Sequence, residues 1–129
     1  MYDFAFNAHS GLRYLILLLG VLTALYALVG MLRKQPVDKP GLTMLRVWTV
    51  LLDIQFLLGI ITILTGRFYP QLMGHLVMMI AAIAVAHLGA VRLKKAEPAA
   101  RTNGLLLAST LVPLALIVAG IIAIGRSIV

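Results

Sequence analysis

The chain alternates between long apolar runs and short polar connections. A transmembrane helix needs about 20 consecutive, mostly apolar residues to cross a hydrocarbon core about 30 Å thick. Four runs reach that length, and they cover residues 11–32, 42–65, 72–91 and 104–125. The pattern therefore predicts an all-α membrane protein, in which four transmembrane helices form an up-down bundle and residues 1–129 make a single domain.

The composition supports a membrane rather than a soluble protein. Of the 129 residues, 62% are hydrophobic, whereas about half of a soluble domain is apolar. The first run lacks a preceding basic stretch and a small-residue cleavage site, so we expect a spanning helix rather than a removed signal peptide. The absence of cysteine excludes disulfides, iron–sulfur clusters and thiolate metal sites.

The net charge of +7 is distributed unevenly among the connections. The first connection contains Arg33, Lys34 and Lys39, and Arg46 follows it closely. The third connection and its flank contain Arg92, Lys94, Lys95 and Arg101. The second connection has only Arg67, and the C-terminus only Arg126. Cytoplasmic connections carry the excess of basic residues, so the first and third should be cytoplasmic and both termini outside. The same distribution favours anionic membrane lipids over nucleic acid as partners.

Two histidines open the first and third apolar runs. Both helices should descend from the outer face, so His9 and His75 should lie at similar depth, on helices that can be diagonal across a four-helix core. Two facing histidines suit bis-imidazole ligation of a b-type haem. Arg13, one turn below His9, could then pair with a haem propionate. The alternative is two interfacial histidines that hydrogen-bond to backbone, water or lipid.

A second polar pair is expected nearer the cytoplasmic side. Asp53 is the only acidic residue at membrane depth, so it should face the bundle interior and have a partner. His87 should lie within a turn or two of it, and about 120° around the helix from His75. A carboxylate beside an imidazole satisfies both groups. Such a pair can relay protons, orient a quinone or ligate a metal; the alternative is a structural buried pair that fixes helix register.

One internal similarity is present. Residues 58–63, Leu-Gly-Ile-Ile-Thr-Ile, are similar to residues 119–124, Ala-Gly-Ile-Ile-Ala-Ile, and the first and third helices each begin with a histidine. A duplicated pair of helices would explain this similarity. Chance similarity between apolar segments of low complexity explains it equally well.

Three motifs carry a resemblance to a known family. Residues 9–14, His-Ser-Gly-Leu-Arg-Tyr, resemble the His-Ser-Gly-Leu-Arg-Trp opening of small four-helix bacterial membrane proteins labelled "cytochrome b family". Residues 54–59, Ile-Gln-Phe-Leu-Leu-Gly, are similar to their Ile-Gln-Leu-Leu-Ile-Gly, and residues 74–79, Gly-His-Leu-Val-Met-Met, to their Glu-His-x-x-Met-Met. The resemblance extends over the first three helices. The residues that it implies carry the family's function are His9, Arg13, Gln55, His75 and Met78.

The sequence departs from the family's pattern at four positions. Tyr14 replaces the usual Trp, and Gly74 replaces the usual Glu, which removes a possible partner of His75. Asp53 stands where a histidine can occur, and His87 is not part of the pattern. The pair formed by Asp53 and His87 is therefore expected to be particular to this protein.

The residues and the resemblance together favour a small haem-b-type or quinone-associated subunit of an electron-transfer complex in a bacterial inner membrane. His9 and His75 would be the metal ligands, with Arg13, Gln55 and Met78 beside the cofactor. A quinone or another tetrapyrrole, such as a chlorin, is the other ligand class that we consider.

The alternative is a cofactor-free accessory subunit that packs against other subunits of a larger respiratory or photosynthetic membrane complex. The small size of the chain and the Ala- and Gly-rich helix faces favour it. A transporter or proton channel ranks third, because it would normally have more than one intramembrane acid. No nucleophile–base constellation occurs, so no catalytic residues are expected.

Overall fold

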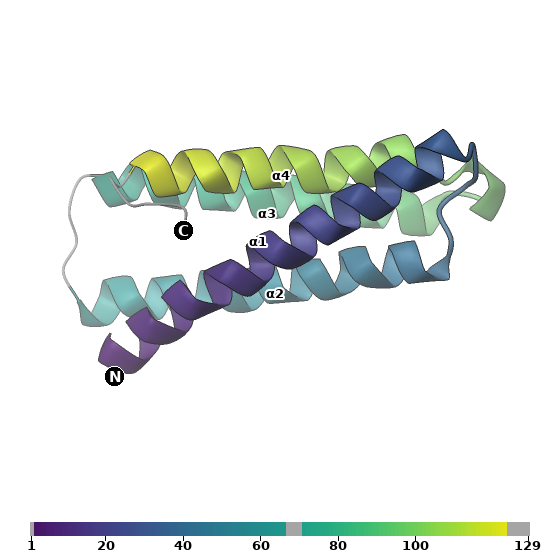
Figure 1. Ribbon diagram of the computed structural model, residues 1–129. Helices are drawn as coiled ribbons and strands as arrows, with labels where there is room; N and C mark the ends of the chain where they lie inside the picture. The colour runs from purple at the N-terminus through teal and green to yellow at the C-terminus, as the bar shows by residue number, and fades with distance from the viewer. Residues whose placement is uncertain (1, 67–70, 124–129) are drawn as a thin grey trace.

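Four long helices make up nearly all of the protein. The computed structural model describes residues 2–66 and 71–123, and Figure 1 shows the helices side by side along a common direction. They are α1 (Tyr2–Leu32), α2 (Lys39–Thr65), α3 (Gln71–Lys95) and α4 (Asn103–Ala123), with a short 3₁₀ helix, η1 (Pro98–Ala100), before α4. All four are long and apolar enough to cross a membrane, which confirms the prediction of a four-helix, all-α chain with the character of a multi-pass membrane protein.

Two helices extend by four residues or more beyond one end of the apolar runs that predicted them. α1 begins at Tyr2 and includes the polar residues before position 11. Asp3 lies in its first turn, where a negative charge interacts favourably with the positive end of the helix dipole. α3 continues past residue 91 to Lys95, with basic side chains in its last turn. The predicted end of the last helix at 125, and the positions of Arg67 and Arg126, lie outside the described residues.

Each of α1 and α3 packs on both α2 and α4. α1 packs on α2 and α4, and α3 packs on α4 and, over a shorter stretch, on α2. Among the described residues, no Cα of α1 comes within 8 Å of a Cα of α3. Figure 1 shows α1 crossing the bundle obliquely, with its N-terminal end nearer α2 and its C-terminal end nearer α4. α1 and α3 therefore lie apart, each packed on α2 and α4, which is an arrangement that the sequence analysis allowed.

A buried tryptophan organises the half of the core nearer the first connection. The Trp48 side chain is fully buried, and its Nε1–H donates to the Ile16 carbonyl at 2.8 Å. Its ring lies directly against Gly20, where a Cβ would come within 3.0 Å of Trp48 Cζ2. Leu45 and Leu106 are also buried there. The indole therefore satisfies its only polar atom on the backbone of the helix against which it packs.

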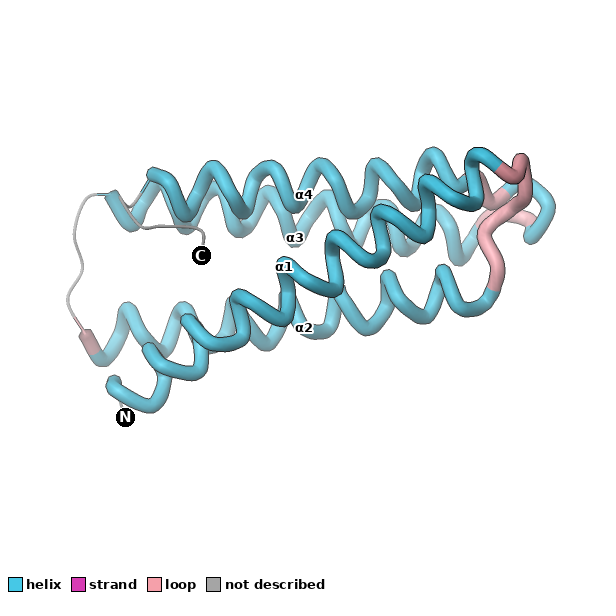
Figure 2. The backbone as a smooth tube through the Cα atoms, viewed as in Figure 1, coloured by secondary structure: helices cyan, strands magenta, loops and turns pink. Residues whose placement is uncertain are grey.

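The first and third connections are joined at one end of the bundle, where Figure 2 shows both loops. The Val37 amide donates to the Arg101 carbonyl at 2.8 Å, and Asn103 Nδ2 donates to the Gln35 carbonyl at 2.6 Å. Arg101 Nε donates to the Leu93 carbonyl at 2.8 Å, so it satisfies one of the free carbonyls at the end of α3. The first connection, the end of α3 and the start of α4 are thus held together in one small region.

Asp38 starts α2 and connects it to α1. Its carboxylate accepts the Gly41 amide at 3.0 Å as the N-cap of α2, and Pro40 lies in the first turn, where its missing N–H costs nothing. The Tyr26 hydroxyl contacts both Asp38 oxygens, at 2.8 and 2.6 Å. The hydrogen bond from Tyr26 holds the pKa of the Asp38 carboxyl below its usual value.

We expect the Asp38→Ala variant to unfold more easily by about 1 kcal/mol, because it loses the cap of α2. Since the folded-state pKa is lowered, the ionised Asp38 contributes stability above the usual aspartate pKa of about 3.9. That contribution is lost as the pH falls through the lower folded-state pKa. Urea unfolding in detergent micelles at neutral and acidic pH measures both effects. Asp38→Asn, which keeps a side-chain acceptor but does not titrate, should reduce the pH dependence; an unchanged pH profile in this variant would contradict the assignment.

A glycine allows the closest contact between α3 and α4. A Cβ at Gly89 would collide with the Ser109 hydroxyl and would lie 2.5 Å from Ser109 Cβ. Gly89→Ala should therefore push the two helices apart and lower the unfolding free energy by about 1–3 kcal/mol. Thermal unfolding in detergent, followed by circular dichroism, measures this loss.

Gly11→Ala is the matched control, because a Cβ at Gly11 meets nothing within 4 Å and alanine is the better helix former. It should leave stability unchanged or raise it. Pairing Gly89→Ala with Ser109→Gly moves the small residue to the other helix and should recover part of the loss. Equal melting temperatures for Gly89→Ala and Gly11→Ala would show that α3 and α4 are not in close contact there.

Candidate functional site

The imidazoles of His9 and His75 meet across the diagonal of the bundle. Their ring centroids are 6.4 Å apart, and their planes are nearly perpendicular, at 88°. The side chains therefore span the gap that the backbones of α1 and α3 leave open. The prediction that these two histidines lie at the same depth on opposite helices agrees with this geometry.

Each ring is oriented by a backbone carbonyl of a different neighbouring helix. His9 Nδ1 lies 3.1 Å from the Gln55 carbonyl of α2, and His75 Nδ1 lies 3.1 Å from the Gly120 carbonyl of α4. A carbonyl oxygen only accepts, so Nδ1 is the protonated, donating nitrogen of each ring. A neutral imidazole in this tautomer has its lone pair on Nε2, the arrangement found when a histidine ligates a metal through Nε2.

Two glycines make room for these hydrogen bonds. A Cβ at Gly59 would lie 3.2 Å from His9 Cε1, and a Cβ at Gly120 would lie 3.3 Å from His75 Nδ1 and 2.6 Å from Met79 Cε. Sequence reasoning did not assign either glycine to the site. The similarity between residues 58–63 and 119–124 was the available signal, because the glycine of each segment lies beside one of the two histidines.

Gln55 and His9 are held together by a reciprocal pair of contacts. The Gln55 carbonyl accepts from His9 Nδ1, and Gln55 Nε2 donates to the His9 carbonyl at 2.7 Å. This arrangement fixes both the ring and the backbone at the His9 turn of α1. Gln55 Oε1 is buried and has no hydrogen-bond partner among the described residues. The Gln55 side chain therefore positions His9 through Nε2, and its Oε1 remains as a buried acceptor.

Arg13 brings a cation to the same region. Its guanidinium lies over the Tyr14 ring, 4.7 Å from the ring centroid, and Nη2 donates to the Tyr14 hydroxyl at 2.8 Å. Arg13 Nε is buried and, in the described part of the chain, has no hydrogen-bond partner. A buried N–H of this kind is costly unless something accepts from it. Tyr14, at the position where the family pattern has Trp, thus holds the guanidinium in place.

A cavity of about 170 Å³ lies between the four helices, and both histidines are in its wall. The polar part of the wall consists of His9, Ser10, Arg13, Gln55, Thr62 and His75, and the rest is apolar, including Phe56, Met79 and Ile117. Met78, which the resemblance implied, is not part of the wall; it packs against Gly120, and its neighbour Met79 lines the cavity instead. The helix rotation that turns His75 inward places residue 79, four positions later, on the same face.

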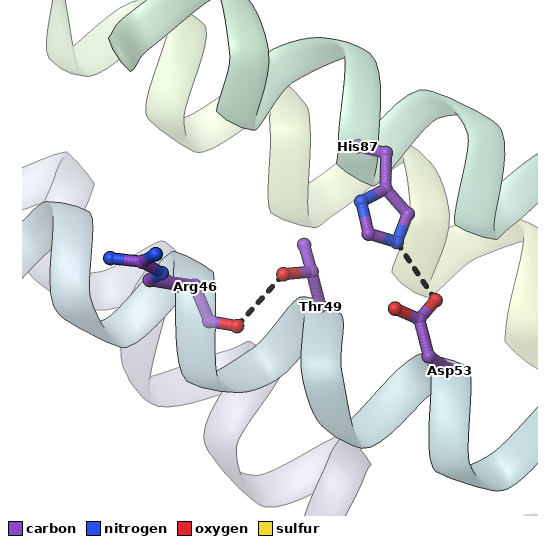
Figure 3. Close-up of polar contacts among 4 residues, drawn as sticks. All are labelled: Arg46, Thr49, Asp53 and His87. Carbon is purple, nitrogen blue, oxygen red and sulfur yellow. Dashed lines mark hydrogen bonds and ion pairs between the residues drawn. The ribbon is translucent and has the colours of Figure 1, made fainter.

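Asp53 and His87 form the expected pair but lie in an unexpected place. His87 Nε2 is 2.8 Å from Asp53 Oδ1 (Figure 3), which matches the predicted proximity. However, the His87 side chain is 44% exposed and the Asp53 side chain is 51% exposed. The expectation that Asp53 faces the bundle interior is therefore wrong. The buried stripe of α2 runs through Trp48, Thr49 and Leu52, so Asp53 falls just beside it, on the outer face between α2 and α3.

The chemistry of the site is limited by its donor set. In residues 2–66 and 71–123, no three His, Cys, Asp or Glu side chains gather as metal ligands. Two imidazoles could hold a haem, which would bring its remaining ligands with it. Comparisons with protein-family models, curated proteins and solved structures find no match to this chain. The function is therefore inferred from the geometry of the cavity.

The tautomer of the two cavity histidines is directly testable. We expect His9 and His75 in the cofactor-free protein to carry their proton on Nδ1, because each Nδ1 donates to a carbonyl. Nitrogen-15 magnetic resonance of ring-labelled histidine in lipid bilayers at neutral pH distinguishes the two tautomers. The chain has three histidines, so His87→Ala leaves only the two signals of interest. A dominant Nε2–H form of either ring would contradict the assigned hydrogen bonds.

Proposed function

We propose that this chain is a small transmembrane subunit of an electron-transfer complex in a bacterial inner membrane, and that it binds a b-type haem between His9 and His75. The four helices cross the membrane in up-down order, with the first and third connections in the cytoplasm and both termini on the outer side. The cavity then lies in the outer half of the bilayer. The spacing of the two imidazoles is the observation that carries the proposal.

That spacing would let His9 and His75 hold one metal ion between them. Their ring centroids are 6.4 Å apart, a gap that a metal with nitrogen ligands at about 2.0–2.1 Å would bridge. The Nδ1 contacts to carbonyls supply the second-shell orientation that ligating histidines require.

The buried polar atoms of the cavity also fit a haem. Arg13 Nε needs an acceptor, and a propionate carboxylate provides one through a charge-assisted hydrogen bond. The volume of about 170 Å³ is smaller than the roughly 300–1,000 Å³ typical of ligand pockets. A haem would therefore fill the cavity and displace wall side chains such as Met79, whose flexible thioether adapts readily.

When bound, haem supplies a one-electron carrier. The contributions of the chain are physical: the two carbonyls hold the imidazoles in one tautomer, Gln55 fixes the His9 turn, and Arg13 balances a carboxylate. The apolar wall excludes water from the site. Low polarity and fixed ligands are the means by which a protein sets the reduction potential of such a group.

The family resemblance gives independent support to the proposal. Four of the five residues that it implied, His9, Arg13, Gln55 and His75, line the one cavity although they come from three helices. We therefore propose that the chain is one of the small four-helix membrane proteins labelled "cytochrome b family". A quinone is the second candidate ligand, because Gln55 Oε1 can accept from a quinol hydroxyl and Arg13 Nε can donate to a quinone oxygen.

An absorption spectrum tests the proposal. The protein purified from bacterial membranes in mild detergent should show a Soret band that shifts on reduction with dithionite, together with extractable haem. His9→Ala and His75→Ala should each lose most of the band, because each removes one axial ligand. His87→Ala should retain it, since the His87 ring contacts Asp53 outside the cavity.

Circular dichroism of each variant separates loss of the ligand from loss of the fold. Folded wild-type protein without a Soret band, and without a band after incubation with added hemin, would contradict haem binding. That result would favour the cofactor-free accessory subunit, in which the two imidazoles simply pack against each other. A band that survives in both His9→Ala and His75→Ala would place the haem elsewhere.

A further inference from the structure

The pair formed by Asp53 and His87 lies at membrane depth, on the surface of the bundle that would face lipid. Asp53 is near the middle of α2, and about half of each side chain is exposed. Polar side chains in transmembrane helices almost always face a protein interior or a water-filled cavity, because exposure to lipid is costly. The wall of the cavity between His9 and His75 includes neither residue. Something other than hydrocarbon is therefore expected to cover it.

The hydrogen-bonding capacity of the pair is only half used. The contact joins His87 Nε2 and Asp53 Oδ1, and no described residue hydrogen-bonds to His87 Nδ1 or Asp53 Oδ2. In its net-neutral form the pair holds one proton between Nε2 and Oδ1 and one on Nδ1. It then presents one free donor, Nδ1–H, and one free acceptor, Oδ2. Both groups belong to side chains that are about half exposed.

A surface that presents one donor and one acceptor is complementary to itself. In a dimer with two-fold symmetry, each contact between residues of the two copies occurs twice. We propose that a second copy of this chain packs on the α2–α3 face, with His87 Nδ1–H of each copy donating to Asp53 Oδ2 of the other. The two pairs then form a closed ring of four hydrogen bonds, and no polar group is left facing lipid.

The surroundings of the pair suit such an interface. Val50 and Leu57, one turn on either side of Asp53 along α2, are exposed apolar residues. Ala84, one turn from His87 on α3, is exposed and small. Small residues let transmembrane helices approach closely, and interhelical hydrogen bonds then add to the packing. This inference is independent of the cavity and its ligand; it requires only that the helices span a membrane.

The absence of native cysteine makes cross-linking a clean test. Val50→Cys and Ala84→Cys place one thiol beside the pair, on α2 and α3 respectively. Leu18→Cys on α1 and Val112→Cys on α4 are matched controls, because both residues are exposed apolar positions on the other two helices. In dilute proteoliposomes treated with copper phenanthroline, the first two variants should form covalent dimers and the two controls should remain monomeric.

Energy transfer between differently labelled copies measures the contribution of the pair. As the lipid-to-protein ratio is raised, the combined Asp53→Leu and His87→Leu variant should dimerise about 5–10-fold more weakly, since each membrane hydrogen bond is worth only a modest amount. This variant keeps an apolar, lipid-compatible surface and should remain folded. The exchange variant, Asp53→His with His87→Asp, restores a self-complementary pair and should recover most of the dimer.

Three outcomes would overturn the proposal. One is a wild-type protein that stays monomeric at every lipid-to-protein ratio. Another is cross-linking at Leu18→Cys or Val112→Cys that equals that at Val50→Cys and Ala84→Cys. The third is a leucine variant that dimerises as strongly as the wild type. Because none of these measurements depends on a Soret band, failure of the dimer and failure of haem binding are distinguishable.

Discussion

The arrangement of this bundle depends on one constraint, which is that a polar ring inside hydrocarbon must find a hydrogen-bond partner within the protein. His9 and His75 meet that requirement on main-chain carbonyls of α2 and α4. Such an acceptor does not rotate or titrate as a side chain does. The two imidazoles are consequently fixed by the backbones of the helices that flank them, and the diagonal of the bundle becomes the place where they meet.

This constraint explains the small residues beside the two histidines. Gly59 and Gly120 occupy equivalent roles, each beside one histidine, and they come from the two segments of similar sequence. The acceptors are not equivalent, because His9 uses the carbonyl of Gln55 whereas His75 uses that of Gly120 itself. Each histidine thus has a glycine beside its ring, but the position of the carbonyl that accepts from the ring relative to that glycine differs between the two. A duplication followed by divergence would give this combination, as would independent selection for space beside a ring.

Sequence reasoning found the helices because hydrophobic length alone determines them. It also placed His9 against His75 and Asp53 near His87, because depth follows from counting residues along a rod. It failed where rotation about the helix axis decides the outcome. Asp53 was assigned to the interior although its neighbour Leu52 is the buried residue. Met78, which the family resemblance implied, lies beside Gly120, and Met79 lines the cavity. A single position corresponds to about 100° of rotation, and uniformly apolar helices give no amphipathic stripe from which to read it.

The hydrogen bonds that join the two connections have a consequence for how the protein is assembled. They tie the chain together at the end of the bundle opposite the histidines, through backbone atoms of Val37, Arg101 and Gln35. The cavity lies toward the other end of the helices, so the contacts that order the two connections do not involve its wall. If a flat cofactor binds as we propose, it would enter a bundle whose connections are already fixed by the chain itself.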